Sequence, residues 1–124
     1  MNPTIFKTIV SGLLFVILIF SGFKLKKTGH PYNFIVVSIH KLSSLVLIVM
    51  FVLLFVIYQK EIRMSQLEFG NFILSALLFI LALISGGLLS ARKTTSKIIL
   101  YTHKITSAFV VISSALFFYL ILNK

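Results

Sequence analysis

The sequence predicts an all-α integral membrane protein, a four-helix bundle built from two tandem helical hairpins. Three observations lead to this fold class. Of the 124 residues, 59% are hydrophobic and 11% are charged, whereas about a quarter are charged in an ordinary soluble domain. The apolar residues are concentrated in four long segments. The second half of the chain also repeats motifs of the first half at a nearly constant offset.

The four apolar segments each approach or exceed the ~20 residues that an α-helix needs to cross the hydrocarbon core of a bilayer. They cover roughly residues 5–23, 34–58, 69–89 and 98–122. Little of the chain is left over for a soluble region, so we expect residues 1–124 to form a single membrane domain in contact with the lipid bilayer. The segments lack the ~10-residue alternating pattern of barrel strands, which favours helices.

The internal repeat relates the first segment to the third and the second to the fourth. The letters SGLLF at 11–15 match SALLF at 75–79, an offset of 64 residues. The pair His40-Lys41 matches His103-Lys104 at an offset of 63. We therefore expect one repeat over about 5–60 and another over about 69–124. Because each copy crosses the membrane twice, the copies should be parallel and related by a pseudo-twofold axis along the membrane normal.

Basic residues are divided unequally between the two ends of the predicted helices. One end carries eight Lys or Arg and no acid, and the other carries four with both acids, Glu61 and Glu68. The positive-inside rule places the richer end in the cytoplasm and both termini outside, as in a bacterial or archaeal cytoplasmic membrane. The net charge of +10 therefore indicates topology, and no nucleic acid partner is expected. The eight are Lys24, Lys26, Lys27, Lys41, Arg92, Lys93, Lys97 and Lys104.

Two histidines lie inside apolar segments, at equivalent places in the two repeats. His40 and His103 fall about six residues into their segments, roughly 9 Å deep at 1.5 Å per residue. A titratable side chain inside a membrane helix is costly and by default marks a functional site. Two imidazoles at one depth, from opposite repeats, predict the axial ligands of one haem iron. The alternative for each histidine is a hydrogen bond between helices.

A glycine, a hydroxyl and a lysine from each repeat complete the predicted cofactor-binding site. The glycines would let a flat ring lie against the backbone. The hydroxyls lie four residues after the histidines, on the same helix face, and leave room for a macrocycle. The lysines can reach the haem propionates or the cytoplasmic boundary. Ordinary helix packing explains the glycines and hydroxyls equally well, and interfacial charge explains the lysines more simply. The six are Gly22, Gly86, Ser44, Ser107, Lys41 and Lys104.

Several other chemistries are disfavoured. The chain has no cysteine, which excludes disulfides, iron–sulfur clusters and covalently attached haem. Zinc is disfavoured because no Asp, Glu or Cys completes a set of four ligands. A small multidrug exporter would need a carboxylate inside the membrane, whereas we expect Glu61 and Glu68 to lie outside the helices. His30, between Gly29 and Pro31, is expected to be a solvated loop residue.

With these residues, the sequence resembles the membrane-embedded b-type cytochromes, in which histidines on facing helices ligate haem. The resemblance covers the whole chain as an architecture and is specific at His40-Lys41, at His103-Lys104 and at the nearby glycines. It implies one haem b per chain near the cytoplasmic face and electron transfer to or from a quinone or a partner subunit. No second haem is expected, because the outer halves of the segments contain no histidine.

The alternative function is a cofactor-free four-helix membrane anchor or assembly subunit. No group of residues marks a catalytic site or a quinone site, so we expect no catalytic residue of the chain's own. Whether the chain turns over a substrate as a quinone-linked oxidoreductase, and whether it forms homo-oligomers, are left open by the sequence.

Overall fold

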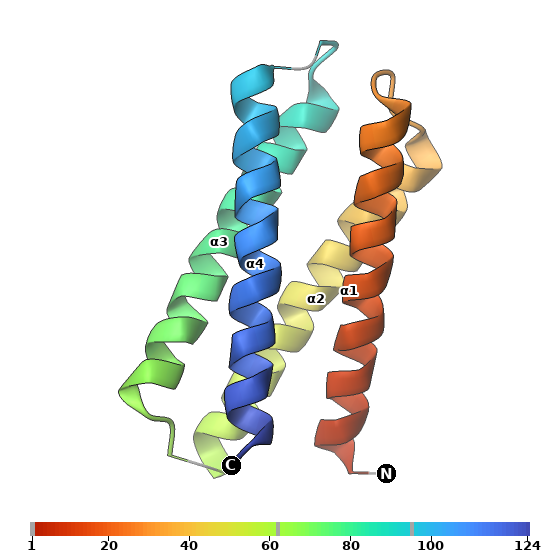
Figure 1. Cartoon of the computed structure of the whole chain (residues 1–124). Coiled ribbons are helices and arrows are strands. Elements are labelled where there is room, and N and C mark those ends of the chain that lie inside the picture. The colour runs from red at the N-terminus through yellow and green to blue at the C-terminus, as the bar shows by residue number, and fades with distance from the viewer. Residues whose placement is uncertain (1, 62, 95) are drawn as a thin grey trace. The chain divides into compact units, whose positions relative to one another are not determined.

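The computed structural model describes residues 2–61, 63–94 and 96–124, and its regular elements are α-helices (Figure 1). Their bounds are α1 (Pro3–Thr28), α2 (Phe34–Glu61), α3 (Gln66–Ala91) and α4 (Lys97–Leu122). These helices coincide with the four predicted segments, and each is long enough and apolar enough to cross a membrane. The predicted all-α class with four long apolar helices is therefore confirmed.

The helices extend past the apolar segments because polar residues cap them. The side chain of Asn2 accepts a hydrogen bond from a backbone N–H of the first turn of α1, and Asn33 does the same for α2. At α3, the Ser65 hydroxyl accepts from the Glu68 N–H, while the Glu68 carboxylate accepts from the Ser65 N–H. This reciprocal pair is a capping box, which satisfies two donors that the helix start would otherwise leave unpaired.

The expectation that both acids lie outside the helices is wrong. Glu61 is the last residue of α2, and Glu68 lies in the first turn of α3, where it is buried. Lys124 Nζ lies 2.6 Å from the Glu68 carboxylate and also donates to the carbonyl of Arg63 at 3.1 Å. The carboxylate is thus held by a cation and a helix cap at the end of α3, and does not project into the middle of a membrane helix.

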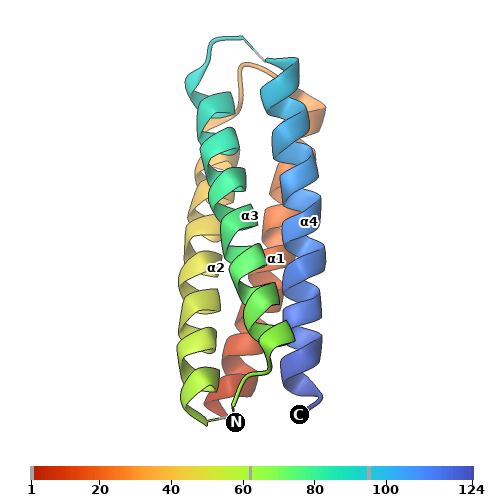
Figure 2. The same ribbon diagram turned by 90° about the vertical axis from the view of Figure 1, so that its left-hand side faces the viewer.

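The chain divides into two compact units, Met1–Leu54 and Phe55–Lys124. The first contains α1 and most of α2. The second contains the end of α2 together with α3 and α4, which lie side by side as an antiparallel hairpin (Figure 2). In the second unit the Phe55 ring stacks on Phe72 with centroids 3.7 Å apart, and Phe72 contacts the Phe117 ring of α4. The division therefore falls inside α2, where aromatic contacts tie its last turns to α3.

The pattern of burial follows the internal repeat. Ser11 in α1 and Ser75 in α3, which are 64 residues apart, are both completely buried. Along α2 and α4, buried positions recur at an offset of 63, in the pairs Ser43 and Thr106, Leu47 and Val110, Leu54 and Phe117, and Tyr58 and Ile121. His40 and His103 lie three residues before the first of these pairs, on the same stripe of their helices. These pairs of equivalent side chains are thus buried alike, whereas α3 also buries Phe72 and Phe79, whose equivalents in α1 are only partly buried.

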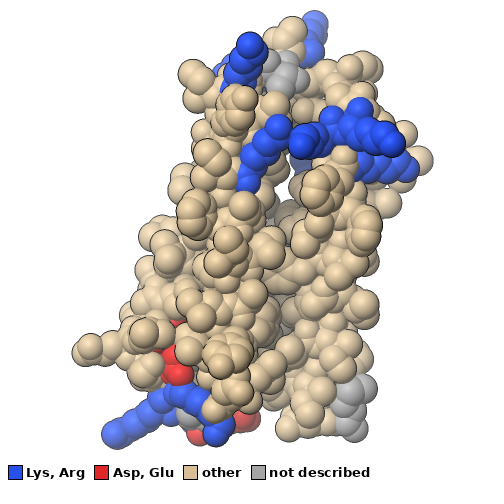
Figure 3. Space-filling view, in the orientation of Figure 1, with Lys and Arg blue, Asp and Glu red and all other residues tan. Residues whose placement is uncertain are grey.

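The outward faces of the helices are apolar along most of their length. Large side chains on them are widely exposed, for example Phe20 at 71%, Phe34 at 83% and Ile98 at 80%. On the face shown in Figure 3, Lys and Arg gather near the helix ends and the middle of the helices carries no charged side chain. Soluble monomers avoid contiguous apolar surfaces of this extent, so these faces suit contact with lipid.

Candidate functional site

His40 and His103 occupy equivalent places in α2 and α4. Each lies six residues after the first residue of its helix, Phe34 for α2 and Lys97 for α4. At a rise of about 1.5 Å per residue, each is therefore about 9 Å from the start of its helix. Both side chains are half-buried. The two histidines are thus at the same distance from the starts of their helices, near the connections that carry the basic residues.

The His40 ring lies against α1. Its Nδ1 atom is 3.1 Å from the carbonyl oxygen of Leu18 and 2.9 Å from the hydroxyl of Ser21. The Ser21 hydroxyl in turn donates to the same Leu18 oxygen at 3.0 Å. Gly22 permits this approach, because a Cβ atom there would lie 3.3 Å from His40 Cε1. One edge of the imidazole therefore contacts a serine hydroxyl and a backbone carbonyl, and the glycine leaves the space that the ring occupies.

The His103 ring lies against α3 in the same way. Its Nδ1 atom is 3.0 Å from the carbonyl oxygen of Ala82 and 3.1 Å from the hydroxyl of Ser85. A Cβ atom at Gly86 would lie only 2.9 Å from His103 Cε1, so the ring is seated even more closely on this helix. Ala82, Ser85 and Gly86 stand 64 residues after Leu18, Ser21 and Gly22. The repeat therefore preserves a three-part seat for each histidine.

These seats determine which imidazole nitrogen carries the proton. A carbonyl oxygen can only accept, so a neutral ring must place its hydrogen on the Nδ1 atom that faces it. The electron pair is then on Nε2, the nitrogen that can bind a metal. Histidines that ligate metals commonly donate their other N–H to a backbone carbonyl, which orients the ring and increases the basicity of the ligating nitrogen. A neutral imidazole in either seat would therefore carry its electron pair on Nε2.

The other predicted site residues divide into two groups. Gly22 and Gly86 contact the imidazoles, which occupy the space beside the glycine backbone. The hydroxyls and lysines lie on the histidines' own helices, where Ser44 donates to the Lys41 carbonyl at 2.7 Å. Ser107 is half-buried, and Lys41 and Lys104 are exposed. The ammonium of Lys104 lies 5.8 Å from the centroid of the Tyr101 ring, a cation–π distance.

Sequence reasoning missed Ser21 and Ser85 as partners of the imidazoles. A signal for them was present, because a serine precedes the glycine in both repeats. Thr106 was also missed: it is buried and donates to the carbonyls of Thr102 and His103. Its hydroxyl stands three residues after the histidine, whereas Ser107 stands four residues after it.

His30 lies in the connection between α1 and α2 and is not part of the seat of His40. Its ring centroid is 4.0 Å from that of Tyr32. The expected loop position is confirmed, but the side chain is only partly solvated: its Nε2 atom is inaccessible, with no hydrogen-bond partner among the described residues.

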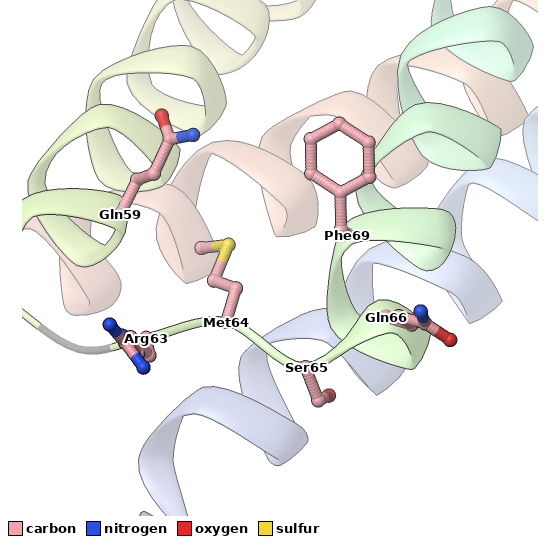
Figure 4. A pocket seen from close by; sticks show the side chains of 6 residues that line it. All are labelled: Gln59, Arg63, Met64, Ser65, Gln66 and Phe69. Carbon is pink, nitrogen blue, oxygen red and sulfur yellow. The ribbon is translucent and has the colours of Figure 1, made fainter.

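A shallow hollow lies at the other end of the second unit, where α2 joins α3 (Figure 4). Its lining is mixed in polarity and contains neither a histidine nor an acid. The hollow is thus separate from the seat of His103, which is near the start of α4. The lining residues are Gln59, Arg63, Met64, Ser65, Gln66 and Phe69.

No family model, no curated protein and no solved structure matches this chain. The functional interpretation therefore depends on the chemistry of the two histidine seats.

Proposed function

We propose that the protein is a membrane-embedded b-type cytochrome that carries one haem b, ligated by His40 and His103 near the cytoplasmic face. The observation that supports it is the paired arrangement of these histidines, each with Nδ1 hydrogen-bonded to a carbonyl of the preceding helix. That hydrogen bond leaves Nε2 as the electron-pair donor in both rings. The role assigned to the protein is electron transfer to or from a quinone or a partner subunit.

The donor set fits haem better than it fits a bare metal ion. Among the described residues, no group of three or more His, Cys, Asp or Glu could hold a metal. The haem macrocycle supplies four nitrogen ligands, so two imidazoles suffice to complete six-coordinate iron. With both of its protein ligands supplied by His40 and His103, the bound haem would supply one-electron oxidation and reduction rather than oxygen binding.

The chain's own residues would bind and orient this group. Nε2 of each histidine would be the ligand atom, and the seats beside Gly22 and Gly86 would keep the rings from rotating. Lys41 and Lys104 are exposed near the basic helix ends, where they could pair with propionates. Ser44 and Ser107 would leave room for the macrocycle. No described residue is assigned a catalytic role.

The proposed topology follows from the basic connections. The Lys-rich end of α1 and the Arg92-Lys93 stretch after α3 would lie in the cytoplasm, with both termini outside. The repeats would then be related by a pseudo-twofold axis along the membrane normal. The compartment that fits is the cytoplasmic membrane of a bacterium or archaeon.

The same hydrogen bonds favour a second function, a cofactor-free membrane anchor or assembly subunit. The histidines would then serve to join α1 to α2 and α3 to α4. Hydrogen bonds between membrane helices contribute about 0.6 kcal/mol on average and up to about 1.7 kcal/mol. Such a role requires no particular ligand for Nε2.

Absorption spectroscopy of the pure protein separates the two functions. The cytochrome proposal predicts a red protein whose spectrum changes on reduction with dithionite and shows low-spin haem. The anchor proposal predicts a colourless protein, even when it is produced in cells with ample haem.

A further inference from the structure

Two buried serine hydroxyls each contact both an imidazole and the backbone of their own helix. Ser21 is 8% exposed and Ser85 is 5% exposed, although each lies in a helix whose outward face is apolar. A serine in a membrane helix can satisfy its hydroxyl on its own backbone without help from another helix. The contact between the serine and the histidine of the next helix is thus not needed to satisfy the hydroxyl, and it occurs in both repeats.

The hydrogen of each serine is directed to its own helix. Ser21 donates to Leu18 at 3.0 Å, and Ser85 donates to Leu81 at 2.8 Å. With its hydrogen engaged, each hydroxyl offers a lone pair to the histidine, whose Nδ1–H can donate to the serine and the carbonyl together. Each serine therefore acts as a second acceptor for the imidazole N–H.

We propose that Ser21 and Ser85 are positioning residues that strengthen the hydrogen bonding of the Nδ1 protons of His40 and His103, and so tune Nε2 as a ligand. The tuning of a ligand rests on the proposed cytochrome function, whereas the hydrogen bond is a property of the chain with or without haem. An acceptor at Nδ1–H increases the electron density on the ring, which makes Nε2 a stronger donor. A stronger axial donor stabilises ferric iron relative to ferrous iron.

The hydrogen bond can be tested on the full chain without haem. The Nδ1 proton is observed by NMR after 15N-labelling of the histidines in detergent. In Ser21→Ala the His40 Nδ1 proton should move upfield while that of His103 stays in place, and Ser85→Ala should give the reverse. Each variant is thus the control for the other. Ser21→Thr and Ser85→Thr, which keep the hydroxyl, should restore the resonances.

The tuning is tested on the haem-loaded chain by potentiometric titration. Either alanine variant should keep low-spin haem and shift the midpoint potential in the positive direction, whereas the threonine variants should return it towards the original value. Ser90→Ala, which removes a hydroxyl bonded to Gly87 in the same helix as Ser85, should leave the potential unchanged.

The outcomes separate this role from the proposed function. Protons on Nε2 in the haem-free chain, or Nδ1 resonances that do not respond to the serine variants, would overturn the positioning role. A coloured protein whose potential is the same in all the serine variants would overturn the tuning alone. A colourless protein whose Nδ1 protons respond as expected would overturn the cytochrome function and leave the hydrogen-bonding role in place.

Discussion

The Nδ1 atom of His103 in α4 lies 3.0 Å from the carbonyl oxygen of Ala82 in α3. The same contact occurs in the first repeat, between His40 and Leu18, at 3.1 Å. A helix carbonyl has two lone pairs and can accept from a side chain while it keeps its bond within the helix. If the helices cross a membrane as proposed, no water would compete for this second lone pair in the hydrocarbon region. Each contact therefore joins two helices and sets the orientation of an imidazole.

Replacement of Gly86 with alanine should displace the His103 ring. The new Cβ would lie 2.9 Å from Cε1, closer than such atoms approach, so the imidazole must leave its seat. We expect loss of most low-spin haem in Gly86→Ala, and a smaller loss in Gly22→Ala, where the distance is 3.3 Å. Haem absorbance per unit of protein measures both effects.

Gly87 provides the matched control. A Cβ there meets nothing within 4 Å, so Gly87→Ala should keep its haem. Alanine should also favour the helix by about 0.5–1 kcal/mol relative to glycine. Equal loss of haem in the Gly86 and Gly87 variants would show that the effect comes from the helix backbone and not from the imidazole.

The histidine variants test the ligands. His40→Ala and His103→Ala should each abolish the low-spin spectrum, because each variant would remove one of the two proposed iron ligands. His30→Ala should retain it, since the His30 ring packs on Tyr32 in the α1–α2 connection and is not one of the proposed ligands. Reduced-minus-oxidised spectra of the three purified proteins provide the comparison. An unchanged spectrum in His40→Ala would refute the ligand assignment.

The ion pair between Glu68 and Lys124 should stabilise the α3–α4 hairpin. Glu68 is buried, and its carboxylate accepts hydrogen bonds from Lys124 and from the Ser65 backbone. Hydrogen bonds to charged groups contribute about 1.5–3 kcal/mol, so Glu68→Ala should lower the free energy of unfolding by an amount in this range. Thermal unfolding in detergent measures the loss.

The exposed Glu61 gives the control for this prediction. Glu61→Ala should leave the unfolding temperature nearly unchanged. Haem content should be retained in both variants, because Glu68 lies at the opposite end of α3 from the seat of His103. If Glu61→Ala lowered the unfolding temperature as much as Glu68→Ala, the ion pair would not be the cause.

The charge asymmetry predicts the orientation in the membrane. Reporter fusions should place the α1–α2 connection, which follows Lys26 and Lys27, in the cytoplasm and the end of α4 outside. A cytoplasmic end of α4 would invert this topology and move both histidines towards the outer face.

Sequence reasoning could predict the four helices, because apolar length is readable along a single chain. The repeated His-Lys pair also drew attention to His40 and His103 as residues at equivalent positions. Sequence reasoning could not predict the seats of the imidazoles. Their acceptors include the backbone carbonyls of Leu18 and Ala82, which no residue type reveals, and the pairing depends on how each helix is rotated. Glu68 was misplaced because the apolar segment starts one residue later, although Ser65 and Glu68 have the spacing of a capping box.

The ratio of haem to protein, measured together with a redox titration of the pure chain, tests the central claim most directly. Because the proposal assigns both iron ligands to His40 and His103, it predicts one haem per chain and a single one-electron wave. One haem per two chains would indicate ligation between copies, and two haems per chain would require ligands other than these histidines. A protein that binds no haem under any condition of production would contradict the proposed function.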